Sequence, residues 1–236
     1  MAGPSLRGVV FDKDGTLFDL QATWGVFAGD FLSELAGGNT DLFGELAKLA
    51  GYDPATGRLL PGSVVIAETP ETIAEVLLPV LPDPPTRSAL VDHINLAAAR
   101  AAMQPAVALG PLLDALRGRG LALGVATNDA EAPAIAHLTA TGILDRFSFV
   151  SGYDSGHGAK PAPGQLLAFA AAAGLDPAEV AMVGDSTHDL LAGRAAGMAT
   201  VGVLTGLAGA HDLAPLADTV LADIGGLPDW IDNRGG

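Results

Sequence analysis

The chain has 236 residues, of which 49% are apolar, 5% aromatic and 17% charged, a composition typical of a globular protein rather than a disordered one. Its net charge of -15, without any cluster of Lys or Arg, argues against binding to the phosphate backbone of DNA or RNA. Zero cysteines exclude disulfides and thiolate metal sites. The N-terminal sequence lacks the apolar stretch of a secretory signal, and no apolar run is long enough to span a bilayer, so we expect a cytoplasmic protein that does not bind membranes.

Short apolar runs rich in valine recur along the chain. They are LRGVVF (6–11), LALGVAT (121–127), FSFVS (147–151), VAMVGD (180–185), ATVGVL (199–204) and DTVLAD (218–223). Most are too continuous for half-exposed strands, which predicts buried strands of a parallel sheet. Helical patterns over 130–141, 165–173 and 187–196 lie between the later runs. This alternation predicts an α/β fold with a doubly wound, Rossmann-like parallel sheet.

The first connection is too long for a simple crossover. The first expected strand ends near Asp12 and the next begins near Leu121, whereas a strand-helix-strand unit needs roughly 30 residues. A helical pattern over 109–116 can serve as the crossover helix, which leaves 20–104 unexplained.

The segment 20–104 has helical periodicity of its own. Its four apolar stripes are Trp24, Phe27, Phe31 and Leu35; Leu42, Leu46 and Leu49; Ile73, Val76 and Leu77; and Leu90, Val91 and Ile94. We therefore predict a helical cap domain over 20–104 and a Rossmann-like core domain formed by 1–19 and 105–236. The alternative is that these helices thicken the main core.

Polar residues follow several of the expected strands. They are Asp12, Asp14, Thr127, Asn128, Lys160, Asp185 and Asp189. Each taken singly has an ordinary structural explanation, such as turn formation or helix capping. However, ligands of open parallel sheets bind beyond the carboxyl ends of the strands, where all these residues are expected to meet. Carboxylates gathered in one crevice repel each other unless a cation intervenes, which predicts a Mg²⁺ site.

The segments DKDGT, ATN, GAKP and GDSTHD, in this order, resemble the four motifs of the haloacid dehalogenase-like (HAD) hydrolase superfamily. The expected cap lies where the helical-cap subgroup has it, and VGDSTHDLLAGRAAGM is similar to the phosphoglycolate phosphatase-like branch. This resemblance implies a Mg²⁺-dependent phosphomonoester hydrolase. Its expected substrate is a small phosphorylated metabolite, such as phosphoglycolate or a sugar phosphate.

The resemblance also implies roles for the aspartates. Asp12 would be the nucleophile that forms an aspartyl-phosphate, and Asp14 would protonate the leaving oxygen and later deprotonate the attacking water. Asp12 and Asp185 would bind Mg²⁺ directly, Asp14 would add its backbone carbonyl, and Asp189 would act directly or through water.

The remaining motif residues would contact the phosphate. Thr127 and the Asn128 amide would hold a phosphate oxygen, and Lys160 would neutralise the nucleophile and the transferring group. Strand alternation predicts that Lys13 points away from the two aspartates, towards solvent or the cap, and has no catalytic duty. We expect His188 on a helix surface.

Other activities remain open at this stage. A phosphomutase with the same fold would depend on a bisphosphate activator, and a non-catalytic protein would use the fold for phosphate binding or protein contact. A dehalogenase is disfavoured because relatives with that chemistry lack the second aspartate, here Asp14. The sequence leaves monomer and homodimer both possible.

Overall fold

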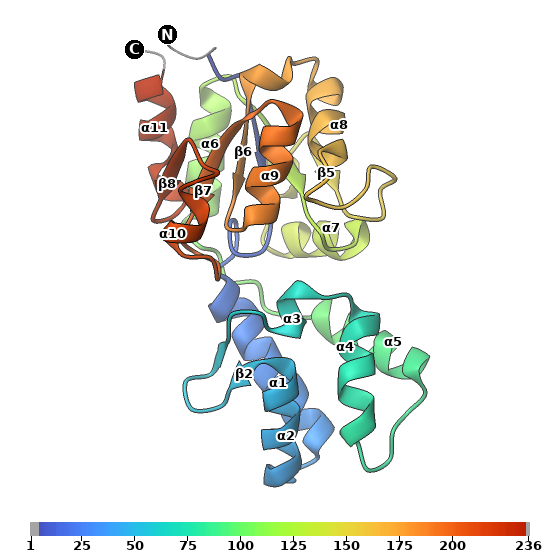
Figure 1. Ribbon diagram of the computed structural model, residues 1–236. Coiled ribbons are helices and arrows are strands. Elements are labelled where there is room, and N and C mark those ends of the chain that lie inside the picture. Colours follow the sequence, from blue (N-terminus) through green and yellow to red (C-terminus); the bar gives the residue numbers. More distant parts are fainter. Residues whose placement is uncertain (1–4, 235–236) are drawn as a thin grey trace. The chain divides into compact units, whose positions relative to one another are not determined.

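The computed structural model describes residues 5–234, which form two compact units (Figure 1). The first unit contains the described residues up to Asp19 and from Pro105 onward, and the second is Leu20–Gln104. The chain thus leaves the first unit once and returns to it once. No helix in the described part of the chain combines the length and the apolar character needed to cross a bilayer.

The first unit is built on a six-stranded sheet in the order β5-β4-β1-β6-β7-β8. Its strands are β1 (Gly8–Phe11), β4 (Ala122–Ala126), β5 (Phe149–Ser151), β6 (Val180–Gly184), β7 (Ala199–Val203) and β8 (Thr219–Leu221). Every pair of neighbours is parallel. β1, β6 and β7 are buried along their whole length, which is why their sequences are continuously apolar. All six predicted strands are confirmed.

Helices lie between these strands along the chain, and one more follows the last strand. They are α6 (Leu109–Gly118), α7 (Glu131–Ala140), α8 (Gly164–Ala173), α9 (Thr187–Ala196), α10 (Ala210–Leu213) and α11 (Leu227–Arg234). Short 3-10 helices cover Leu144–Arg146, Pro177–Glu179 and Ile224–Gly226. α8 and α9 share one core cluster with the sheet, which includes Phe169, Ala192 and Met182. The predicted doubly wound α/β fold is confirmed.

The strand order reverses next to β1. After β1 the chain builds outward through β4 to β5, and then crosses back to β6 on the other side of β1. Phe11 is in register with Val125 of β4 and with Val183 of β6. The carboxyl ends of β1 and β6 therefore flank the crevice in which doubly wound sheets bind ligands.

The second unit is mainly helical. It contains a π-helical turn (Gln21–Gly25), α1 (Val26–Ala36), α2 (Thr40–Ala50), α3 (Val64–Ala67), α4 (Pro70–Leu77), a 3-10 turn (Leu78–Val80) and α5 (Arg87–Ala98). Its core cluster, which includes Phe31, Leu46, Leu77 and Leu90, is composed of residues of this unit. The four apolar stripes of the sequence lie on the π-helical turn with α1, on α2, on α4 and on α5.

Neither the four-residue helix α3 nor a small antiparallel hairpin of this unit was predicted from the sequence. The strands of the hairpin, β2 (Tyr52–Asp53) and β3 (Arg58–Leu59), are two residues long, too short to produce a periodic pattern. The side chain of Gln21 exchanges two hydrogen bonds of 2.9 Å with the backbone of Leu59, which holds the hairpin against the π-helical turn.

Candidate active site

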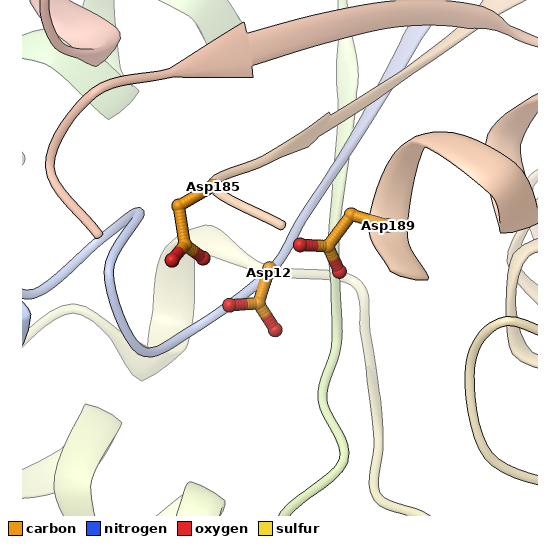
Figure 2. Close-up of side chains that lie close together, drawn as sticks. All are labelled: Asp12, Asp185 and Asp189. Atoms are coloured by element: carbon orange, nitrogen blue, oxygen red, sulfur yellow. The ribbon is translucent and has the colours of Figure 1, made fainter. Parts of the chain in front are cut away.

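Three carboxylates converge at the switch point of the sheet. Asp12 follows β1, Asp185 follows β6, and Asp189 lies in the first turn of α9. One oxygen of each lies within 4.8 Å of the other two, and the side chains face a common space (Figure 2). Their exposed fractions are only 8%, 6% and 2%. Buried, hard oxygen donors at this spacing fit a divalent cation such as Mg²⁺.

Lys160 lies between two of these carboxylates. Its Nζ is 2.6 Å from Asp12 Oδ1 and 2.6 Å from Asp189 Oδ1. Burial lowers the pKa of the Lys160 ammonium, but the two carboxylates outweigh that effect and raise the pKa above its ordinary value. Lys160 is therefore a permanent positive charge within the site.

The single ammonium of Lys160 does not balance the charges of the three carboxylates. Burial is the largest cause that raises the pKa of Asp12 to about 7; Lys160 lowers this pKa, while Asp189 and Asp14 raise it. Burial, followed by the charges of Asp12 and Asp189, also raises the pKa of Asp185 well above its ordinary value. A bound cation would favour the ionised form of both groups.

Asp189 is already engaged through both oxygens. Its Oδ2 accepts hydrogen bonds from Ser186 Oγ at 2.6 Å and from Ser186 N at 3.0 Å, while Ser186 caps α9 in return. Its Oδ1 accepts from Lys160. Of the two predicted modes for Asp189, contact with a cation through water therefore fits better than direct ligation.

The Asp14 side chain lies outside this group of three carboxylates and has a different partner. Its Oδ2 is 2.5 Å from Lys13 Nζ, and the same nitrogen is 3.0 Å from Asp129 Oδ2. The Lys13 side chain is fully buried. The prediction that Lys13 points away from the aspartates, towards solvent or the cap, is wrong.

The reason for this error is that strand alternation does not extend to Lys13. β1 ends at Phe11, and the chain then turns, so that the amides of Leu17 and Phe18 donate to the Lys13 carbonyl at 3.0 and 3.1 Å. In a turn, neighbouring side chains no longer point to opposite faces.

Asn128 joins two loops of the site. Its side-chain amide donates to the Lys160 carbonyl at 3.0 Å, and its Oδ1 accepts from the Lys160 amide at 2.9 Å. The neighbouring Thr127 is buried, and its Oγ1 accepts from the Asp129 amide at 3.0 Å. The structure thus gives the Asn128 side chain a positioning contact with Lys160. The phosphate contacts of Thr127 and Asn128 stay predictions, and His188 is exposed as expected.

Two glycines pack against the Asp185 carboxylate. Gly15 has φ +83°, and both Gly15 and Gly206 approach Asp185 so closely that a Cβ at either position would overlap with its carboxylate. Thr205, beside Gly206, donates from Oγ1 to the Gly15 carbonyl at 2.5 Å, which ties the loop after β7 to the turn after β1. Sequence reasoning missed Thr205 and Gly206, because neither residue type indicates a cation site.

If the three carboxylates bind Mg²⁺, replacing Gly206 by Ala is expected to weaken that binding by roughly 10-fold or more, because the added methyl group must displace Asp185. Isothermal titration calorimetry with Mg²⁺ measures the effect. Gly209→Ala in the same loop is the matched control, since a Cβ there would meet only Asp212 Oδ2, at 3.6 Å. Equal Mg²⁺ affinities for the two variants would contradict the close packing described for Gly206.

Fold and site together define a doubly wound α/β protein with a carboxylate and lysine cluster at the switch point of its sheet. The model of the haloacid dehalogenase-like hydrolase family matches residues 6–197, and the chain belongs to this family. The resemblance recognised from the motifs, including that to the phosphoglycolate phosphatase-like branch, is confirmed.

Individual relatives agree with this membership. The chain is 41% identical over 108 residues to the "Probable phosphatase IndB" of Dickeya dadantii, covering 46% of this chain and 47% of the relative. It is 29% identical to a phosphoglycolate phosphatase of Agrobacterium fabrum, covering 92% and 89%. Among solved structures, a predicted phosphoglycolate phosphatase from Haemophilus somnus has the same fold, with a TM-score of 0.71, 21% identity, and 95% and 97% coverage. The chain spans about half the length of several other curated relatives it matches.

Proposed function

We propose that this protein is a Mg²⁺-dependent phosphatase that hydrolyses a small phosphomonoester through an aspartyl-phosphate on Asp12. The observation that carries this proposal is the convergence of Asp12, Asp185 and Asp189 at the switch point, with the Lys160 ammonium between two of them. Relatives named phosphatases, in a family of hydrolases, support the same reaction class.

In this mechanism the chemistry is divided between two carboxylates. An Asp12 oxygen attacks phosphorus, the bond from phosphorus to the ester oxygen breaks, and Asp14 gives its proton to that oxygen. Asp14 then takes a proton from water as the water oxygen attacks phosphorus, which releases inorganic phosphate and restores the Asp12 carboxylate. The Lys160 ammonium, 2.6 Å from Asp12, favours the ionised nucleophile.

The residues proposed to hold the cation are Asp12 and Asp185, with the Asp14 carbonyl and, through water, Asp189. A bound Mg²⁺ supplies positive charge that lowers the repulsion between the phosphate and the nucleophile. Thr127 and the Asn128 amide are proposed to hold a phosphate oxygen. Lys160 stabilises the charge on the transferring group, and Asn128 keeps the Lys160 backbone in place.

We further propose that the second unit is the cap domain and contributes to the choice of substrate. This unit contains a pocket of about 600 Å³. Phe27 and Phe31 supply apolar surface to the pocket, whereas Arg100, Asp30 and Glu34 supply charges. A mixed lining of this size fits a small polar metabolite. Phosphoglycolate and sugar phosphates are the proposed substrates.

Turnover of phosphate esters tests the proposal directly. With Mg²⁺, the protein is expected to release inorganic phosphate from p-nitrophenyl phosphate and, faster, from one member of a panel of phosphorylated metabolites. Removal of the cation with EDTA should lower the rate by at least about 100-fold, and excess Mg²⁺ should restore it.

The other activities give different results in the same assay. A phosphomutase would convert a sugar phosphate into its isomer and require a bisphosphate activator. A binding protein would hold the ester without releasing phosphate. Either result would contradict the proposed function. The cytoplasmic location and the choice between monomer and homodimer stay predictions.

A further inference from the structure

A second buried lysine, Lys13, has no part in the mechanism above. Its side chain is 0% exposed, whereas the side chains of its partners Asp14 and Asp129 remain 21% and 36% exposed. The ammonium is thus the buried end of the group, and both carboxylates reach it from positions nearer to solvent. Asp14 can therefore contact a substrate while its other oxygen is held by Lys13.

His137 also lies beside the Lys13 ammonium. It lies on α7, is 2% exposed, and places Nδ1 3.3 Å from Lys13 Nζ. Because an ammonium can only donate, Nδ1 is the acceptor in this contact. Lys13 therefore has contacts with the turn after β1, with the loop after β4, and with α7.

The two lysines of this unit have parallel arrangements. Lys160 bridges Asp12 to Asp189, and Lys13 bridges Asp14 to Asp129. Asp12 and Asp14, which carry the proposed chemistry, are thus each paired with a different lysine. Each of these lysines also contacts one further carboxylate. Removing an ammonium from water costs several kcal/mol, which an apolar side chain in the same space would not cost. A buried lysine here is best explained by a need to fix a carboxylate.

We propose that Lys13 is a positioning residue that, anchored by Asp129 and His137, fixes the Asp14 carboxyl group: one oxygen accepts a hydrogen bond from Lys13, and the other carries the proton that goes to the leaving oxygen. This inference rests on the proposed phosphatase function and adds a residue to it. Asp14 lies in a turn, where its side chain would otherwise choose among rotamers, and the 2.5 Å contact with Lys13 restricts that choice. Proton transfer requires such fixed geometry.

The dependence of the rate on the leaving group tests this role. An alkyl phosphate needs a proton on its leaving oxygen, whereas p-nitrophenolate leaves without one. We expect Lys13→Met to lower kcat about 100-fold for glycerol 2-phosphate but less than about 10-fold for p-nitrophenyl phosphate, with KM nearly unchanged for both. A merely structural role would lower the two rates equally.

Arg119→Met is the matched control, because it removes another cation of the same unit whose carboxylate partner, Asp232, is exposed. Both of its rates should equal those of the wild type. Asp129→Asn provides a milder test that leaves Lys13 and Asp14 in place. If circular dichroism shows that Lys13→Met is unfolded, the Asp129→Asn variant tests the role of Lys13 instead. It should also slow the alkyl phosphate more than the aryl phosphate.

Three results are then distinct. A larger loss with the alkyl phosphate supports the role of Lys13. Equal losses for the two esters, or no loss, in a folded variant would overturn that role and leave the phosphatase function intact. A wild-type protein that hydrolyses neither ester would overturn the proposed function itself, and with it the role of Lys13.

Discussion

Replacing Asp12 by Asn is expected to lower kcat for phosphate ester hydrolysis by at least about 10⁴-fold, because an amide cannot form the aspartyl-phosphate. The substitution changes one buried oxygen and leaves the rest of the site in place. Burial raises the pKa of Asp12 to about 7, which means that its ionised form is disfavoured in the folded state. Because Asn carries no charge, the substitution should not lower the stability of the folded state at neutral pH. Steady-state kinetics and a thermal melt measure the two effects.

Asp114→Asn is the control for this substitution. It also removes a carboxylate from the first unit, but one that is exposed and paired with Arg146 at 3.0 Å. Its kcat should match that of the wild type. Acid-quenched wild-type protein should contain a phosphorylated peptide that includes Asp12, detectable by mass spectrometry. Full activity of purified Asp12→Asn protein would rule out the covalent mechanism.

Replacing Lys160 by Met is expected to lower both activity and stability. The loss of its ammonium should lower kcat about 10³-fold, since the nucleophile and the transferring phosphate lose their fixed positive charge. Without Lys160, Asp12 and Asp189 remain buried beside each other, which should lower the free energy of unfolding by about 3–5 kcal/mol at neutral pH. Enzyme kinetics with Mg²⁺ tests the first effect, and urea denaturation without added Mg²⁺ tests the second.

Lys48→Met serves as the control, because Lys48 is the exposed lysine of the second unit. It should change neither kcat nor the urea midpoint. If Lys160→Met retained the wild-type kcat, Lys160 would have no role in catalysis. If it retained the wild-type stability, the carboxylates would not depend on its charge.

Much of the first unit could be predicted from the sequence because its signals are local. Each buried parallel strand is a continuous apolar run, and α9 begins at Thr187 and ends at Ala196, the limits that the helical pattern predicts. The sequence also predicted that Asp12 and Asp185 lie close together although they are far apart in the chain, because parallel strands bring their carboxyl ends to one edge of the sheet. The predicted fold and family are thereby confirmed, whereas the roles of the site residues stay predictions.

The remaining features depend on contacts that local patterns do not record. The partners of Lys13, Asp129 and His137, are 116 and 124 positions away in the sequence. They reach it only because β4, which precedes them in the chain, pairs with β1. The closeness of Gly206 to Asp185 similarly depends on the path of the loop after β7. Strand alternation was the wrong rule for Lys13, because the strand ends before it.

The raised pKa values of Asp12 and Asp185 make the cluster of three carboxylates a proton-binding site as well as a candidate cation site. Folding raises the pKa of Asp12 from 3.8 to about 7, so the stabilisation that its proton provides is complete below pH 3.8 and is lost as the pH rises through about 7. Over the same range, affinity for a divalent cation rises, because cation and proton compete for the same oxygens. Loading of the proposed Mg²⁺ site would therefore exchange protons for the cation, and acidity would set how much of the cation the protein holds.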